Sequence, residues 1–249
     1  MSEPIPAATV VIFRERGDGP PELLMVERAK AMAFAGGALV FPGGRIDPED
    51  RSFAGMIPGA PQDGAARLAA IRETIEEAGI AIGLTTMPDR DGIAAVRSRL
   101  HAGQGLAAAL GEASLVPDLD ALVPFARWLP AHRHARVFDT HFYLARLPED
   151  APEPEVDATE NVRVFWATPQ DTLAAADAGE VTIIFPTRRN LERLALFGSF
   201  DDAVAHARSY PIRAITPWVQ ERDGMAHLCI DDDLGYPITS EPLTSSLRG

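Results

Sequence analysis

A short run of residues, Arg72 to Ile80, carries three glutamates at helical spacing. Glu73, Glu76 and Glu77 stand at positions i, i+3 and i+4, so a helix here would direct three carboxylates to one side. Like charges at this spacing repel one another by about 0.2–0.5 kcal/mol per pair, and only Arg72 is near enough to offset them. Oxygen ligands suit hard divalent ions such as Mg2+ and Mn2+, which bridge readily to phosphate oxygens. The run therefore indicates metal-assisted phosphate chemistry.

A glycine pair lies upstream, in the sequence Phe-Pro-Gly-Gly-Arg-Ile-Asp over residues 41–47. Paired glycines let the main chain approach a ligand where a Cβ atom would obstruct it. A main-chain carbonyl at this turn is a further oxygen donor for a metal ion.

Gly44 and residues 72–80 together resemble the Nudix box, whose pattern is G-x5-E-x7-R-E-U-x-E-E-x-G-U, with U a bulky apolar residue. Asp50, with Glu49 beside it, stands where the pattern has its first glutamate, and Thr74 occupies an apolar position.

The box is split. Asp50 and Arg72 are much further apart than the pattern requires, so an insertion separates its two halves. Residues 51–64 are rich in Gly and Pro and show no sustained apolar period, which predicts a surface loop. Lengthening a loop costs little, because closure entropy grows only logarithmically with length.

A split box of this form is similar to a branch of the superfamily that contains the peroxisomal coenzyme A diphosphatases of animals and their bacterial relatives. Further similar stretches are Leu23-Leu24, Arg28, Phe34, residues 136–142 and Pro186-Thr187.

The resemblance implies a Nudix α/β/α sandwich with a mixed, curved sheet and additional helices. It also implies hydrolysis of the diphosphate bond in a nucleoside diphosphate linked to a moiety X. Coenzyme A or an acyl-coenzyme A is the leading substrate, and ADP-ribose, NADH and nucleotide sugars are the alternatives. The implied cofactor is Mg2+ or Mn2+.

The candidate metal ligands are the three glutamates together with the Gly44 carbonyl, which enters by analogy with the family. In the family the general base is either the acid of the Arg-Glu pair or an acid from a later loop, so Glu73 and Glu160 are both candidates. Glu155 and Asp157 compete with Glu160, and a solvated acidic loop is the plain alternative for all three.

Arg72 has two interpretations. It can orient Glu73 or a phosphate, or it can form a simple i,i+4 ion pair with Glu76, worth about 0.3–0.5 kcal/mol.

Four further residues are candidate substrate contacts. Guanidinium groups match phosphate oxygens in bidentate geometry, and an aromatic ring can stack on adenine. These candidates are Arg28, Arg45, Arg136 and Phe34; each is alternatively a surface or packing residue.

Hydrophobic periodicity predicts the elements around the box. Strands are expected over 7–16, 22–28, 38–41, 123–129, 136–147 and 161–167, and helices over 65–78, twice within 91–113, from Pro169, over 186–197 and over 201–208. Leu68, Ile71 and Ile75 form the buried stripe of the helix that carries the acids.

We expect one domain over residues 1–249. It would carry a loop insertion at about 51–64, a helical insertion at about 91–113, and a C-terminal extension at about 211–249 that contains a hairpin.

Composition limits the remaining possibilities. A formal charge of −13 disfavours a nucleic-acid surface, and no stretch reaches the roughly 18–20 apolar residues of a membrane span. The single cysteine, Cys229, excludes an internal disulfide, and a cytoplasmic location is expected. A homodimer is possible.

Two rival functions keep the same scaffold. One is a Nudix protein that senses a nucleotide without cutting it, which the intact acids disfavour. The other is an isomerase, which would need different acids and a thiol near the glycine turn.

Overall fold

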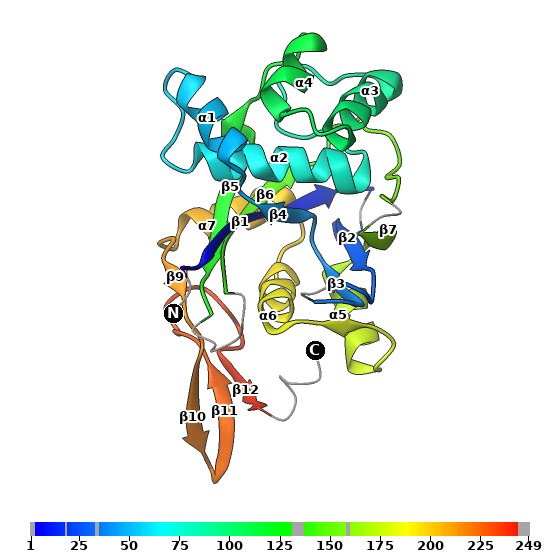
Figure 1. Cartoon of the computed structure of the whole chain (residues 1–249). Helices are drawn as coiled ribbons and strands as arrows, with labels where there is room; N and C mark the ends of the chain where they lie inside the picture. Colours follow the sequence, from blue (N-terminus) through cyan, green and yellow to red (C-terminus); the bar gives the residue numbers. More distant parts are fainter. Residues whose placement is uncertain (1–2, 18, 33–34, 131–136, 158–159, 244–249) are drawn as a thin grey trace.

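The structure is a computed structural model that describes residues 3–17, 19–32, 35–130, 137–157 and 160–243. Its centre is a mixed β-sheet with helices on both faces (Figure 1). The central strand β1 (Ile5–Arg14) pairs antiparallel with β2 (Glu22–Arg28) and parallel with β6 (Phe138–Arg146). Phe13 lies opposite Leu23 in the first pair, so the predicted opening hairpin is confirmed.

The remaining strands of this sheet extend it on both sides of β1. They are β3 (Ala38–Val40), β4 (Gly43–Arg45), β5 (Val123–Trp128), β7 (Asn161–Ala167), β8 (Thr182–Ile183) and β9 (Ala214–Ile215). Their order is β8-β3-β2-β1-β6-β5-β9, while β4 pairs with β1 and β7 pairs with β2.

Side chains of β1 divide between two hydrophobic cores, as the two-residue period of a strand requires. Ala8, Val10 and Ile12 belong to the core that contains α2 (Gly64–Ala78). Val11 and Phe13 belong to the core on the opposite face. Because both faces of the sheet are covered, the predicted α/β/α sandwich is confirmed.

Helix α2 lies directly on the first face, and its stripe of Leu68, Ile71 and Ile75 is buried as predicted. Gly79 ends it in the left-handed conformation, at φ 62°. Above α2 in Figure 1 lie α1 (Pro48–Met56), α3 (Arg90–His101) and α4 (Leu106–Glu112). The two helices predicted within 91–113 are therefore present.

The second face carries α6 (Phe185–Leu194) and α7 (Phe200–Arg208), with α5 (Pro169–Asp177) beside them. Thr168 caps α5 by accepting a hydrogen bond from the Asp171 N–H. A short 3₁₀ helix (Leu119–Ala121) precedes β5.

One sequence prediction was wrong. Residues 51–64 do not form only a loop, because α1 runs through Met56. The Asp47 N–H donates to the Asp50 side chain at the start of α1, and Phe53 and Ala54 pack against the core around α2. Capping and packing therefore outweigh the glycine and proline content of the segment.

The C-terminal extension folds as a second, three-stranded sheet. It consists of β10 (Trp218–Arg222), β11 (Met225–Cys229) and β12 (Ser240–Pro242). The predicted hairpin is present, although its first strand begins at Trp218 rather than at Ile212. Tyr236 is buried and donates a hydrogen bond to Asn190 of α6, which ties the extension to the second face. The division into one domain with three additions stays a prediction.

The helices in the described part of the chain are each too short or too polar to serve as a bilayer span.

Candidate active site

Gly43 and Gly44 were expected to form a turn, but they lie in the short strand β4, which pairs with β1 and contacts α2. A Cβ atom on Gly44 would overlap the carboxylate of Glu73, and a Cβ atom on Gly43 would overlap the main chain of Ala8 and Thr9 in β1. The missing side chain of Gly43 therefore allows close packing against β1, and the missing side chain of Gly44 leaves room for the Glu73 carboxylate.

Glu77 is a buried acid of the site. The Gly43 N–H donates to its Oε2 at 3.0 Å, and the Asn161 side-chain amide donates to its Oε1 at 3.2 Å. Burial raises the pKa of Glu77 to about 7, although these two hydrogen bonds and the nearby Arg28 oppose that rise. The start of β4 and the start of β7 thus hold this carboxylate in one orientation.

Arg72 connects the acids of the site. Its Nη1 donates at 2.9 Å to both Glu73 and Glu76, and its Nη2 donates at 2.9 Å to the Arg45 carbonyl. Asp50, which is 1% exposed, accepts from Nε at 3.2 Å and from Nη2 at 3.0 Å. Burial opposes the charged form, but the hydrogen bond to Asp50 and the surrounding acids raise the pKa of Arg72 above its ordinary value. Arg72 therefore makes both the orienting contact with Glu73 and the i,i+4 pair with Glu76.

Burial disfavours the charged form of each of the three glutamates. Burial raises the pKa of Glu73 to about 8, with the charges of Glu77 and Glu76 adding to the shift and Arg72 opposing it. Burial also raises the pKa of Glu76. A divalent cation would stabilise the charged carboxylates, which are its preferred donors, so the donor set fits such an ion. No group of three His, Cys, Asp or Glu side chains within the described ranges is already clustered as a metal site.

One cleft of about 530 Å³ brings the predicted residues together. Its lining includes Arg28, Gly44, Arg45, Arg72, Glu73, Glu76, Glu77 and Glu160. Phe34 and Arg136, the two other predicted substrate contacts, lie outside the described residues.

Arg28 is a cation of this cleft and stands at an irregularity in strand β2. The register of β2 against β7 shifts between Glu27 and Arg28, and such a bulge re-aims the next side chain. The Arg28 Nε is buried without a hydrogen-bond partner, and its Nη2 lies 4.0 Å from Glu160. A buried, unpaired N–H at the cleft is suited to an anionic oxygen.

Two of the three loop acids that were candidates for the general base lie in the cleft, and the third does not. Glu160 and Asp157 line the cleft. Glu155 lies in a neighbouring pocket and is exposed, and its hydrogen bond from Arg90 lowers its pKa.

Comparison with known proteins identifies the chain. A family model described as the NUDT19 Nudix domain matches residues 54–194, which is more than half of the sequence. The chain belongs to the Nudix hydrolase family.

Similar Nudix proteins support this assignment over most of the chain. The chicken acyl-coenzyme A diphosphatase NUDT19 is 28% identical, covering 87% of this chain and 73% of the relative. The human protein of the same name is 27% identical, with 85% and 72% covered. A crystal structure of a Nudix hydrolase from Alicyclobacillus acidocaldarius superposes with a TM-score of 0.71 at 28% identity, covering 82% of this chain and 97% of that one.

Both departures from the Nudix pattern have a structural explanation. Asp50 is shorter than the glutamate that the pattern expects, yet it reaches Arg72 with both carboxylate oxygens. Thr74 is fully buried at its apolar position because its hydroxyl donates to the Ala70 carbonyl at 2.7 Å, one turn earlier.

Sequence reasoning missed two residues of this Nudix site. Asn161 begins β7 and orients Glu77; its polarity at the start of an apolar strand was the available signal. His101 ends α3 and lines the cleft, with its Nε2 3.3 Å from the Glu76 carbonyl. A histidine at the exposed end of an inserted helix gives no such signal.

Proposed function

We propose that this Nudix hydrolase cleaves the P–O–P bond of a nucleoside diphosphate linked to a moiety X, with coenzyme A or an acyl-coenzyme A as the leading substrate. The observation that carries the proposal is the single cleft in which Glu73, Glu76 and Glu77 lie beside Gly44, with Arg28 on its wall. Acids that suit a divalent ion thus stand next to a cation that suits a phosphate.

The proposed cofactor is Mg2+ or Mn2+, held by the three glutamates and the Gly44 carbonyl. When bound, the ion would neutralise phosphate charge and lower the pKa of water. The chain's own residues have separate tasks. Arg72 holds Glu73 and Glu76 in place, Arg28 binds a phosphate oxygen, and Glu73 accepts the proton of the attacking water.

The assignment of X is supported by two relatives named acyl-coenzyme A diphosphatase. ADP-ribose, NADH and nucleotide sugars are the alternatives, and we propose a cytoplasmic protein that acts on a small molecule.

The test is a product assay with purified protein, Mg2+ or Mn2+, and a panel of coenzyme A, acyl-coenzyme A, ADP-ribose, NADH and nucleotide sugars. We expect release of phosphopantetheine and adenosine 3',5'-bisphosphate from coenzyme A, abolished by EDTA. If nucleotides bind tightly but no substrate on the panel is cut, the protein is a sensor and the proposal fails.

Glu76→Gln tests the metal assignment. Because the variant loses one anionic donor, the Mg2+ concentration for half-maximal activity should rise by about tenfold or more, with the rate recovering at high Mg2+. The control is Glu112→Gln, since Glu112 pairs with Arg99 on the surface and does not line the cleft. An unchanged Mg2+ dependence in Glu76→Gln would remove Glu76 from the ligand set.

Gly44→Ala tests the close approach of β4 to the Glu73 carboxylate. The added Cβ would displace the Glu73 carboxylate, and a displacement on the order of 1 Å can cost about 100-fold in rate. We expect kcat to fall by about that factor. Gly55→Ala in α1 is the matched control, because nothing lies within 4 Å of its added Cβ; parental activity in both variants would contradict the prediction.

A further inference from the structure

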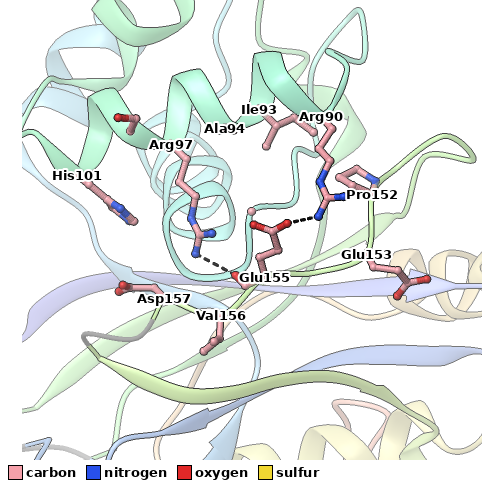
Figure 2. A pocket seen from close by; sticks show the side chains of 12 residues that line it. Arg90, Ile93, Ala94, Arg97, His101, Pro152, Glu153, Glu155, Val156 and Asp157 are labelled. Atoms are coloured by element: carbon pink, nitrogen blue, oxygen red, sulfur yellow. Dashed lines mark hydrogen bonds and ion pairs between the residues drawn. The ribbon is translucent and has the colours of Figure 1, made fainter.

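A second pocket lies beside the catalytic cleft, between the inserted helix α3 and residues 152–157 (Figure 2). Its volume is about 340 Å³, within the range of small-molecule sites. His101 and Asp157 line both the pocket and the cleft. A ligand that reaches past these two residues would therefore extend from one site into the other.

Hydrogen bonds hold both walls of the pocket to the carboxyl end of α2, the helix that carries the three glutamates. Arg97 of α3 donates at 2.9 Å to the carbonyls of Glu76 and Glu155. The Glu155 N–H donates to the Ala78 carbonyl at 2.8 Å, and the Asp157 N–H donates to the Glu77 carbonyl at 3.0 Å. A group bound in the pocket is thereby placed at a set position relative to Glu76 and Glu77.

The charged side chains of the pocket already have protein partners. Arg90 pairs with Glu155, as Figure 2 shows, and Arg97 is engaged by main-chain carbonyls. Glu153 pairs with Arg14 and Arg16 outside the pocket. Each arginine that lines the pocket thus has a partner. The cleft differs, because the Arg28 Nε there has no hydrogen-bond partner.

Most of the uncharged side chains of the lining are apolar. Ile93 and Ala94 contribute from α3, and Pro152 and Val156 contribute from the opposite segment. Together with main-chain groups and Ser98, these surfaces suit a chain that alternates methylene and amide groups. A second phosphate would meet acids here, because Glu153, Glu155 and Asp157 also line the pocket.

We propose that this pocket is the subsite for the uncharged arm of X, a pantetheine-like chain of amide and methylene groups, with the anionic nucleotide half held on the Arg28 side of the cleft. The inference rests on the proposed hydrolysis, and it specifies which substrates are cut best. The inserted helix α3 therefore favours substrates whose X is extended and uncharged, and disfavours substrates whose X is a second nucleoside phosphate.

The test fills the pocket without touching the acids. Ala94 and Ala95 are adjacent exposed residues of α3, but only Ala94 lines the pocket, so Ala94→Trp and Ala95→Trp form a matched pair. Calorimetry in Mg2+ would measure the Kd of each variant for 4'-phosphopantetheine and for adenosine 3',5'-bisphosphate, and kcat/KM would be measured with coenzyme A and ADP-ribose.

We expect Ala94→Trp to raise the Kd for 4'-phosphopantetheine by about tenfold or more, the loss of about 1.4 kcal/mol of contact. Its Kd for adenosine 3',5'-bisphosphate and its kcat/KM for ADP-ribose should match those of Ala95→Trp. Equal Kd values for 4'-phosphopantetheine in the two variants would overturn the subsite.

The two proposals fail in different ways. If the parent cuts coenzyme A but Ala94→Trp behaves as Ala95→Trp, only the subsite falls. If the parent hydrolyses no substrate while Ala94→Trp alone weakens 4'-phosphopantetheine binding, the result supports the subsite and contradicts the proposed hydrolysis.

Discussion

Replacing Glu73 by glutamine is expected to lower kcat by about 10³-fold, whereas replacing Glu160 should lower it by less than about tenfold. Glu73 lies against Gly44 and is held by Arg72, so its carboxylate has one position from which to accept a proton. The Glu160 side chain is 58% exposed and lies 4.0 Å from Arg28. General acid–base catalysis contributes roughly 10²–10⁴-fold, and loss of a metal donor adds to the effect at Glu73.

The experiment compares kcat for Glu73→Gln and Glu160→Gln at saturating Mg2+ with the substrate that the parent cuts best. Glu180→Gln is the control, because Glu180 is exposed and does not line the cleft. Circular dichroism would establish that all three variants fold. A greater loss in Glu160→Gln than in Glu73→Gln would transfer the base to the later loop and contradict the assignment.

The part of the site that sequence predicted best is the part contained in one helix. Leu68, Ile71 and Ile75 gave the buried stripe, and the same period placed Glu73 and Glu76 away from it. Fold and chemistry follow from one local pattern here, because helical geometry determines both faces.

Contacts between distant segments were beyond sequence reasoning. Asn161 and Glu77 are 84 positions apart, and His101 and Glu76 are 25 positions apart. No spacing rule connects such pairs, since the path of the chain between them decides whether they meet. The same limit applies to the second pocket, whose walls come from α3 and residues 152–157.

Helix α1 shows a different limit. Its segment contains glycines that local propensity assigns to loops, and the helix depends on the Asp50 cap and on Phe53 packing against the core. Tertiary contacts overrode propensity at this insertion. Asp50, the buried partner of Arg72, lies in the first turn of α1, just before the insertion, so that turn belongs to the site.

Asp50→Ala is expected to lower the free energy of unfolding by about 3 kcal/mol. Asp50 accepts two hydrogen bonds from Arg72 and one from the Asp47 N–H, and it is almost fully buried. Removing one partner of a buried ion pair typically costs about 3–5 kcal/mol, because the other charge stays buried. Arg72 would keep Glu73 and Glu76, which places the expected loss at the lower end of that range.

Urea denaturation of the two variants Asp50→Ala and Glu49→Ala would measure this loss. Glu49 is the adjacent acid in the first turn of α1 but is exposed, so its removal should change stability by no more than about 0.5 kcal/mol. Both variants lose one negative charge near the helix N-terminus, and only Asp50→Ala loses the buried contact with Arg72. Equal stability in the two variants would show that Arg72 is held by the glutamates alone, and that the split box does not depend on its first acid.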